Sequence, residues 1–377
     1  MTAPVANGYA LCFTGARSLN KRMSLFVEGV LAAGGAACVV ALPRGQWSIQ
    51  RFESMQANIA QSRLSLKLQM NAKSSLKVIF CFHWLVLPFA VVVGLIRRVP
   101  VVYDEHDHYE VNTLESNGGA FRRWFSSRLI RLIHRTMLPF VSMVTCIHMA
   151  NDALKRHLQQ WQPCVLELHN FPVAAWRDAC QESSIDSKLC FIYMGGVFAE
   201  KGVGKAADAF QQLPTEIRNN CELHIFGSGD TELLSQLQQM PDVVVHNSQS
   251  PQQLRHFASL RRCCGLVLYA EHPRYRLIGT NSRKLYEYLA LGMPVISTTV
   301  GELPQFLTEH RVGLLIDAAI DVQELTGAMQ QLAESKTRWR ELSENARRLM
   351  LMPEMTWEHE WGKVVNSGVL NELRRAA

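Results

Sequence analysis

Residues 189–196 read LCFIYMGG and residues 222–229 read ELHIFGSG, and each apolar run ends in a glycine turn. The stretch between them, GKAADAFQQL (204–213), has the apolar spacing of a helix. A buried strand, a glycine turn, a helix and a second buried strand are typical of a parallel sheet wound by helices. The pattern therefore predicts an α/β fold with ligand-binding turns at the carboxyl ends of its strands.

The same alternation extends in both directions along the chain. Before residue 173 the sequence predicts a helix at 23–33 and strands at 9–14, 37–42, 78–82, 99–103, 141–146 and 165–168. After a polar linker at 173–188 it predicts helices at 231–240, 250–260 and near 282–291, and strands at 242–245, 265–270 and 294–298. We expect two doubly wound, Rossmann-like domains in tandem, covering 1–172 and 186–353.

Composition narrows the class of protein. A chain of 377 residues with 48% hydrophobic and 19% charged residues suits two ordinary globular domains. The net charge of +6 indicates anionic ligands or an anionic membrane surface, and we expect no nucleic-acid partner because no RNA- or DNA-binding module is recognisable. The ten cysteines form neither a CxxC pair nor a zinc-ligand spacing, so we expect reduced core thiols of a cytoplasmic protein.

The apolar stretch VIFCFHWLVLPFAVVVGLI (78–96) carries no formal charge and is nearly long enough to span a bilayer. His83 and Pro88 interrupt it, and the alternation requires a strand, a short helix and a following strand here. We therefore expect a buried segment rather than a membrane span. The first residues lack a basic start followed by an apolar core and a cleavage site, so no signal peptide is expected.

Four turns in the second half follow predicted strands: GGVFAEKG (195–202), GSGD (227–230), HNSQS (246–250) and EHPRYRLIGTNSRK (271–284). Glycine lets a phosphate approach the backbone, and the start of a helix offers free N–H groups and a positive dipole end. Lys201 and either Arg283 or Lys284 would add charge for a diphosphate. The alternative interpretation is that these are plain turns with solvated lysines.

The segment TNSRKLYEYLALGMPVISTTVGELPQFL (280–307), followed by VGLLID (312–317), resembles the donor-binding segment of GT-B fold glycosyltransferases, especially glycosyltransferase family 4 (group 1) and its relatives. YMGGVFAEKG (193–202) and HIFGSGD (224–230) stand where that family has its phosphate turns. Looser similarity covers NKRMSLFVEGVLAAGGAACVVAL (20–42), VVYDEHDHYE (101–110), LHNFP (168–172) and MTWEHEW (355–361). The resemblance implies two Rossmann-like domains facing across a cleft, with a terminal helix in 354–377 that crosses back to the first domain.

The resemblance also assigns donor-binding residues. Glu287 matches the second glutamate of the family's Glu-x7-Glu motif, which holds the ribose hydroxyls, and Lys201 matches the lysine that neutralises the diphosphate. The residues expected at the donor are Gly195, Gly196, Lys201, Gly227, Gly229, Asn247, Thr280, Asn281, Ser282, Arg283, Lys284 and Glu287.

The chain departs from the family pattern at two places. Gly279 stands where the first glutamate is expected, and Gly196 or Val197 replaces an arginine of the phosphate clamp. Our hypothesis is that Arg283, with Arg276 or Arg274, supplies the lost charge.

Four carboxylates and two histidines occupy the stretch DEHDHYE (104–110), directly after a predicted strand. In an extended chain Asp104, His106 and His108 face one side and would hold Zn²⁺ or Mn²⁺. A polar loop is the plainer interpretation. In the family pattern, His106 instead matches the histidine that approaches the donor sugar. Because a GT-B site stabilises the diphosphate leaving group with helix dipoles and basic side chains, we expect no metal.

The role of this stretch depends on stereochemistry. A retaining enzyme of the family leaves the acceptor proton to the donor phosphate, and His106 then orients the sugar. An inverting enzyme needs a base, and Asp107, Asp104 and Glu110 are the candidates. We expect retention, with His106 and, as the alternative base, Asp107 as the catalytic residues.

The stretch FRRWFSSRLIRLIHR (121–135) mixes arginines with Trp124, Leu129, Leu132 and Ile133. It predicts either an amphipathic packing helix with a solvated basic face or a patch that rests on anionic lipid.

Together these features predict a glycosyltransferase that moves a sugar from a UDP- or GDP-linked donor to a glycan or lipid-linked acceptor, in bacterial surface polysaccharide synthesis. No separate cofactor is expected, and the expected location is the cytoplasm or the inner face of the plasma membrane. The alternatives are an inverting transferase, a nucleotide-sugar epimerase, a catalytically silent binding subunit of the same fold, and a zinc hydrolase built on 104–110.

Overall fold

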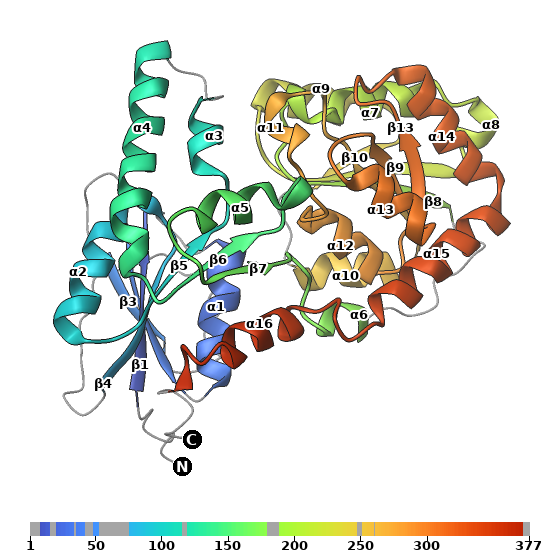
Figure 1. The fold of residues 1–377 in the computed structure, drawn as a ribbon. Helices are drawn as coiled ribbons and strands as arrows, with labels where there is room; N and C mark the ends of the chain where they lie inside the picture. Colours follow the sequence, from blue (N-terminus) through green and yellow to red (C-terminus); the bar gives the residue numbers. More distant parts are fainter. Residues whose placement is uncertain are drawn as a thin grey trace. The chain divides into compact units, whose positions relative to one another are not determined.

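The structure is a computed structural model that describes residues 8–15, 20–33, 35–41, 48–52, 75–114, 119–178, 188–246, 251–259 and 261–371. Asn247, Cys180 and the middle of the predicted linker, 179–187, lie outside these residues. The chain forms two compact units. One comprises Met1–His169 and His359–Ala377, and the other comprises Asn170–Glu358. Each unit contains a largely parallel sheet with helices packed on it (Figure 1).

The first unit is built on a seven-stranded sheet of order β3-β2-β1-β4-β5-β6-β7. Its strands are β1 (Gly8–Thr14), β2 (Ala36–Ala41), β3 (Ser48–Phe52), β4 (Ser75–Cys81), β5 (Val101–Glu105), β6 (Met143–Ile147) and β7 (Val165–Leu168). Only β3, an edge strand that we did not predict, pairs antiparallel. Its principal helices are α1 (Lys21–Ala32), α2 (Leu87–Arg97), α3 (Tyr109–Leu114), α4 (Ala120–Met137), α5 (Ala153–Gln159) and α16 (Trp357–Asn366).

The second unit has the order β10-β9-β8-β11-β12-β13, which repeats the positions of β3-β2-β1-β4-β5-β6 without a counterpart of β7, and all its pairs are parallel. The strands are β8 (Leu189–Met194), β9 (Cys221–Phe226), β10 (Val243–His246), β11 (Arg262–Val267), β12 (Val295–Thr298) and β13 (Gly313–Ile316). The helices are α6 (Ala175–Asp178), α7 (Val203–Gln211), α8 (Thr215–Arg218), α9 (Thr231–Gln239), α10 (Pro251–Ser259), α11 (Pro273–Arg276), α12 (Arg283–Ala290), α13 (Leu303–His310), α14 (Val322–Glu334) and α15 (Lys336–Met350).

The predicted tandem of doubly wound sheets is therefore confirmed. Alternation along the strands explains why helices cover both faces of the second sheet. Phe191 packs in one core cluster with α7 and α14, whereas its neighbour Ile192 packs in another with α12 and α15. The order of each sheet reverses direction beside its first strand, at β1/β4 and at β8/β11, which is where such sheets bind ligands.

The apolar stretch 78–96 forms most of β4 and α2, as predicted. Within the residues that the structure describes, no helix is both long enough and apolar enough to cross a membrane. Gly94 allows α2 to lie close against β5, because a Cβ there would come within 2.3 Å of Val101 Cγ2.

Several predicted boundaries were wrong. The predicted strand 99–103 is displaced to Val101–Glu105, so the first two acids of the 104–110 cluster are buried strand residues rather than loop residues. The predicted strand 265–270 begins earlier, at Arg262. Part of the predicted linker is the helix α6, because Trp176 is buried against the second core. Among the nine described cysteines, all free, Cys164 is exposed rather than in the core.

Candidate functional site

Two glycine turns lie side by side at the carboxyl edge of the second sheet. Gly195 follows β8 with φ of +136°, a backbone conformation that favours glycine. Val197 N donates to Ser228 O at 3.0 Å, and Asp230 N donates to Val197 O at 2.8 Å. A Cβ at Gly227 would lie 1.9 Å from Gly195 O, so close backbone approach alone requires glycine there. A phosphate contact of these turns stays a prediction.

Lys201 and Lys284 lie among three tyrosines, and we call these five residues the lysine–tyrosine cluster: Tyr193, Lys201, Tyr269, Tyr275 and Lys284. Lys201 Nζ donates to the Tyr275 hydroxyl and lies 4.8 Å from the centre of that ring. Lys284 Nζ lies 4.5 Å from the ring centre of Tyr269 and 5.1 Å from that of Tyr193. Cation–π contacts hold both ammonium groups without neutralising them.

The cluster holds two lysine amino groups, and no carboxylate among the described residues is bound to either. Among the described residues, no salt bridge joins Lys201 or Lys284 to an Asp or Glu. Burial, and next the charge of Lys201, lower the pKa of Lys284 to about 7. A lysine in this state gains stability when an anion approaches, because the anion restores the preference for the charged form. The cluster is therefore suited to an anionic ligand.

The N-terminus of α12 adjoins the lysine–tyrosine cluster. Ser282 precedes the helix and is buried, and its hydroxyl lies 2.9 Å from the hydroxyl of Tyr269. No side chain caps the helix, so its first N–H groups and its positive dipole end are available to an anion. Tyr193 also donates to Gly196 O at 2.9 Å, which ties the first glycine turn to the cluster.

The structure thus gathers four sequence-predicted positions, Gly196, Lys201, Ser282 and Lys284, in one place. The three tyrosines were missed. Tyr193 and Tyr269 occur at or just after the ends of β8 and β11, in YMGG and LYAEH, and that position was a signal that could have found them.

Arg283 points to a different partner. Its Nε donates to Glu287 Oε1 at 2.9 Å across one turn of α12, and its side chain is 46% exposed. Arg276 lies 3.7 Å from Glu271, with both side chains exposed, and the side chain of Arg274 is outside the described residues. Lys284, rather than these arginines, adjoins Lys201. The nearby Asn281 carbonyl accepts from Asn170 Nδ2 at 3.0 Å.

A cavity of about 390 Å³ lies beyond β11, β12 and β13 of the same sheet. It is lined by Glu271, His272, Arg276, Thr299, Val300, Gly301, Asp317 and Ala318. None of the eleven predicted donor residues that the structure describes lines this cavity, and no residue of the lysine–tyrosine cluster lines it either.

In the first unit, the 104–110 stretch begins with two fully buried acids. Asp104 accepts from Arg22 Nη2 at 2.8 Å and from Nε at 2.9 Å, and from Thr145 Oγ1 at 2.7 Å. Glu105 accepts from the Tyr103 hydroxyl at 2.6 Å and lies 3.2 Å from His134 Nε2. Burial raises the pKa of Glu105, but His134 and Tyr103 outweigh that effect and hold it below its usual value.

Among the acids and histidines of the stretch, His106 and Asp107 are the partly exposed ones. His106 is 19% exposed, and the Tyr109 hydroxyl lies 3.0 Å from its Nε2. His108 is buried with its ring centre 4.8 Å from that of His157. Glu110 is bound by Arg131 and lies 3.2 Å from His157 Nε2. The structure therefore leaves His106, Asp107 and Tyr109 as the residues of this stretch that solvent or a substrate can reach.

The structure does not bring together the metal ligands considered for this stretch. Within the described residues, no group of three ligand atoms within 4.8 Å includes Asp104, His106 or His108. Asp104 forms a salt bridge with Arg22, and the ring of the buried His108 contacts that of His157. This geometry therefore gives no support to a zinc hydrolase built on 104–110.

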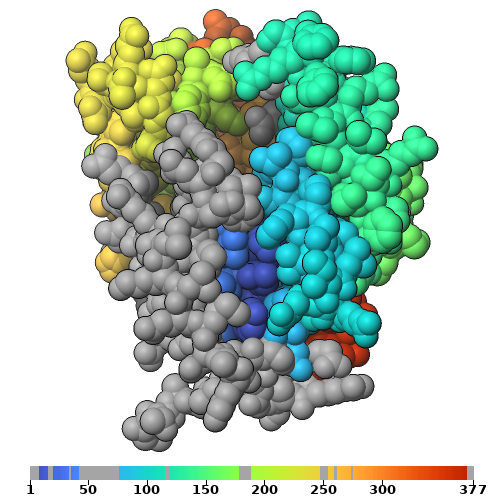
Figure 2. Space-filling view, turned by 90° about the vertical axis from the view of Figure 1, so that its left-hand side faces the viewer, coloured from blue at the N-terminus to red at the C-terminus, as the bar shows by residue number. Residues whose placement is uncertain are grey.

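Helices α2 and α4 adjoin, and both lie on the face seen in Figure 2. Their exposed large apolar residues are Phe89, Val92, Leu95, Ile96, Phe121, Trp124, Phe125 and Leu132, and Leu85 just before α2 is exposed as well. In α4 the buried positions are instead Ser127, Ile130 and His134. The interpretation of 121–135 as a helix that packs by its apolar side chains was therefore wrong for Trp124 and Leu132. We call the exposed apolar residues of α2 and α4, with Arg122, Arg123 and Arg128, the α2/α4 surface.

Comparisons with known proteins agree with this architecture. Residues 177–349 match the family model described as glycosyl transferases group 1. WaaG, a glycosyltransferase involved in lipopolysaccharide biosynthesis, shares 14% identity at a TM-score of 0.65, covering 95% of this chain and 99% of that one. Anabaena HepE, solved with UDP and glucose, shares 12% identity at a TM-score of 0.65, covering 96% of this chain and 99% of that one. Sucrose-phosphate synthase from Thermosynechococcus elongatus shares 16% identity at a TM-score of 0.60, covering 98% of this chain and 100% of that one. No curated protein matches the sequence.

The solved structures share the two-sheet fold, and the family match covers the unit that carries the glycine turns, the lysine–tyrosine cluster and α12. Residues 177–349 therefore match the family of glycosyl transferases group 1, and the chain as a whole has the two-sheet fold of the GT-B glycosyltransferases that it resembles.

Proposed function

We propose that the second unit binds a nucleotide sugar by its diphosphate at the lysine–tyrosine cluster and the N-terminus of α12. The observation that carries this proposal is the pair Lys201 and Lys284, two cations held by tyrosines beside an uncapped helix start. As the sugar leaves, negative charge develops on the diphosphate, and these groups would stabilise it without a metal ion. Glu287, one turn along α12, is proposed to hold the ribose hydroxyls.

The donor is proposed to carry UDP, with GDP as the alternative. HepE was solved with UDP-glucose, which supports a uridine nucleotide in this fold at 12% identity. The acceptor is proposed to be a glycan or lipid-linked sugar of a bacterial surface polysaccharide. The lipopolysaccharide role of WaaG supports this acceptor class.

His106 is proposed to orient the donor sugar in a transfer that retains configuration. Its partial exposure and its contact with Tyr109 leave one imidazole accessible and held in place. In an inverting reaction Asp107 is the proposed base, because Asp104 and Glu105 are buried and already accept several hydrogen bonds.

The test combines binding and product analysis. We expect UDP-sugars or GDP-sugars, screened by thermal shift, to raise the melting temperature more than ADP-sugars do. With an accepted substrate pair, NMR of the product anomer should show retention. Donor turnover without acceptor would indicate an epimerase instead, and absence of both nucleotide binding and nucleotide release would indicate a silent subunit.

We also propose that the α2/α4 surface rests on anionic lipid. Apolar side chains and arginines share this surface, and Phe121 is 76% exposed. Aromatic rings insert at the headgroup level while arginines meet anionic phosphates. Co-sedimentation with vesicles containing anionic lipid should exceed that with neutral vesicles, and should fall in the Arg122→Ala/Arg123→Ala/Arg128→Ala variant. Equal binding to both vesicle types would contradict the proposal.

A further inference from the structure

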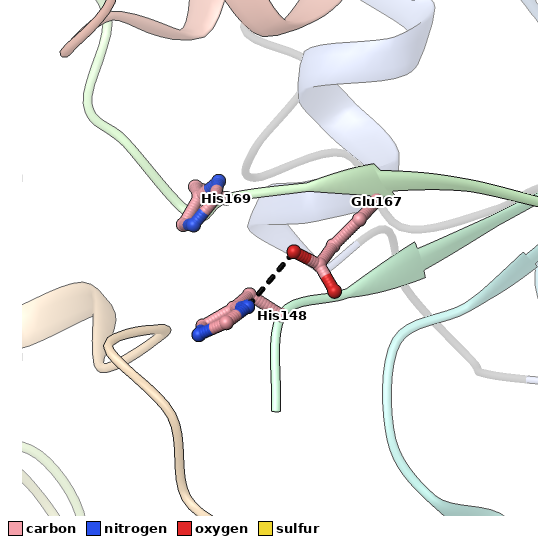
Figure 3. A group of neighbouring side chains, drawn as sticks. All are labelled: His148, Glu167 and His169. Atoms are coloured by element: carbon pink, nitrogen blue, oxygen red, sulfur yellow. Dashed lines mark hydrogen bonds and ion pairs between the residues drawn. The ribbon is translucent and has the colours of Figure 1, made fainter. Parts of the chain in front are cut away.

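Three side chains meet where two neighbouring strands of the first sheet end (Figure 3). His148 follows the last residue of β6, Glu167 is the third residue of β7, and His169 follows the last residue of β7. The two strands pair in parallel with Ile147 opposite Leu168, which brings these three side chains to the same edge.

The ligand atoms of the three residues converge. One nitrogen from each histidine and one carboxylate oxygen of Glu167 lie within 4.8 Å of one another. His148 Nδ1 lies 2.8 Å from Glu167 Oε1, and the two imidazole rings stack at 5.0 Å with 24° between their planes. An ion placed among them would replace the proton that His148 and Glu167 now share.

Glu167 has an incompletely satisfied carboxylate. Its Oε2 is buried and has no hydrogen-bond partner among the described residues. Leaving a buried carboxylate oxygen unpaired costs about 1 to 3 kcal/mol, which a bound cation would offset. The three side chains keep between 14% and 25% of their surface exposed, so an ion can reach them from solvent.

A second carboxylate lies behind His169. Glu360 Oε2 accepts from the His169 backbone N–H at 2.9 Å and lies 3.8 Å from His169 Nδ1. Glu360 is buried and is itself held by Lys363 Nζ at 2.6 Å. Metal-binding histidines commonly donate their second ring N–H to a carboxylate, and Glu360, at 3.8 Å an ion-pair contact rather than a hydrogen bond, is placed to take that position.

Another cluster in the chain provides a contrast. Cys190, Glu222 and His224 in the second unit also place ligand atoms within 4.8 Å of one another. There Glu222 Oε2 already lies 3.0 Å from Arg261 Nη1 and 3.0 Å from His224 Nε2. A guanidinium at that oxygen satisfies its charge and repels a cation, so this second cluster is complete without an ion.

We propose that His148, Glu167 and His169 bind one divalent transition-metal ion. Two imidazoles and one carboxylate are a zinc ligand set that leaves a fourth, tetrahedral position for water. The site belongs to the first unit and does not rest on the proposed diphosphate contacts of the second. Failure of either proposal therefore leaves the other intact.

The experiment titrates the chelator-treated full-length chain with Zn²⁺ by calorimetry and with Co²⁺ by visible absorption. We expect one ion per chain and a tetrahedral Co²⁺ spectrum. Since losing an outer contact typically weakens metal binding about 10- to 100-fold, His148→Ala, His169→Ala and Glu167→Gln should each weaken it at least about 100-fold. Glu360→Gln should weaken it about 10-fold.

The matched control is the variant Glu222→Gln/His224→Ala, which should bind Zn²⁺ like the parent chain. Because Glu167→Gln preserves size and shape, it guards against loss of binding through misfolding, and thermal unfolding of each variant checks this. The proposal is overturned if the parent chain takes up no ion, if the three ligand variants bind as it does, or if only the control variant loses binding.

Discussion

The two units place charge at the carboxyl edges of their sheets in opposite ways. In the second unit Lys201 and Lys284 rest on tyrosine rings, and among the described residues no acid forms a salt bridge with them. In the first unit the acids Asp104 and Glu105 are buried and fully engaged by Arg22, Thr145, Tyr103 and His134. The edge of the second unit is therefore suited to an external anion, whereas the acids at the edge of the first unit already have partners and His106 stays partly exposed.

The largest effect is expected on stability, from breaking the buried salt bridge between Arg22 and Asp104 in the first unit. Asp104→Ala should lower the free energy of unfolding by about 3 to 5 kcal/mol, because the Arg22 guanidinium stays buried without its carboxylate. Urea unfolding measures this. The double variant Asp104→Leu/Arg22→Met should recover most of the loss. If Asp104→Ala lowered the free energy of unfolding by less than about 1 kcal/mol, Arg22 would reach water and the pair would behave like a surface salt bridge.

His106→Ala should lower kcat by about 100-fold, the lower range for a positioned side chain in proton or charge transfer. UDP affinity should not change, since His106 belongs to the first unit and the proposed diphosphate contacts belong to the second. Asp107→Asn separates the two stereochemical cases. It should leave kcat within about twofold in a retaining enzyme, and a loss comparable to that of His106→Ala would make Asp107 the base of an inverting one.

Removing one lysine of the lysine–tyrosine cluster should weaken nucleotide binding. Lys201→Ala should lower UDP affinity by about 10- to 100-fold, since a charge-assisted hydrogen bond contributes about 1.5 to 3 kcal/mol. Calorimetry gives the dissociation constant. Lys205→Ala is the control, because Lys205 is exposed and donates to Ala319 O instead. Equal losses in both variants would mean that only overall charge matters.

The low pKa of Lys284 predicts a pH dependence. Its pKa of about 7 in the free protein should rise when a diphosphate binds, so binding takes up a proton above that pH. UDP affinity should therefore fall several-fold, up to about tenfold per unit, as the pH rises from about 7 to 9. Calorimetry in buffers of different ionisation enthalpy measures the proton uptake. The uptake should vanish in Lys284→Met, and its persistence there would assign it to another group.

The smallest effect is expected at Arg283. Because its guanidinium is half exposed and pairs with Glu287, Arg283→Ala should change UDP affinity by only about two- to threefold. A tenfold or larger loss would support the hypothesis that Arg283 replaces the arginine missing at Gly196.

The architecture could be predicted from the sequence because local patterns of apolar residues and glycines mark its strands and turns. Strands such as Leu189–Met194 and Cys221–Phe226 are short apolar runs closed by glycine, and parallel sheets bury such runs on both faces. The strand Ser48–Phe52 was missed because its residues, SIQRF, carry little apolar signal and it pairs only at the sheet edge. Val101–Glu105 was displaced because two acids normally end a strand, whereas here Arg22 and His134 compensate them from distant positions.

The candidate site was predicted only in part, because some of its contacts join residues that are distant in the sequence. Lys201 and Lys284 could be named from glycine turns and a helix start, but their tyrosine partners depend on tertiary packing. Similarly, His148, Glu167 and His169 are spaced along the sequence without a metal motif, and only the pairing of β6 with β7 brings them together.

The interlocked glycine turns have a kinetic consequence. Because Gly227 lies against Gly195 and Gly229 against Val197, neither turn can move without breaking backbone contacts with the other. Their conformational entropy is therefore lost when the chain folds and not again when a ligand arrives. A nucleotide sugar would meet a surface that is already in its final shape, and its release would be governed by ligand contacts rather than by reordering of these turns.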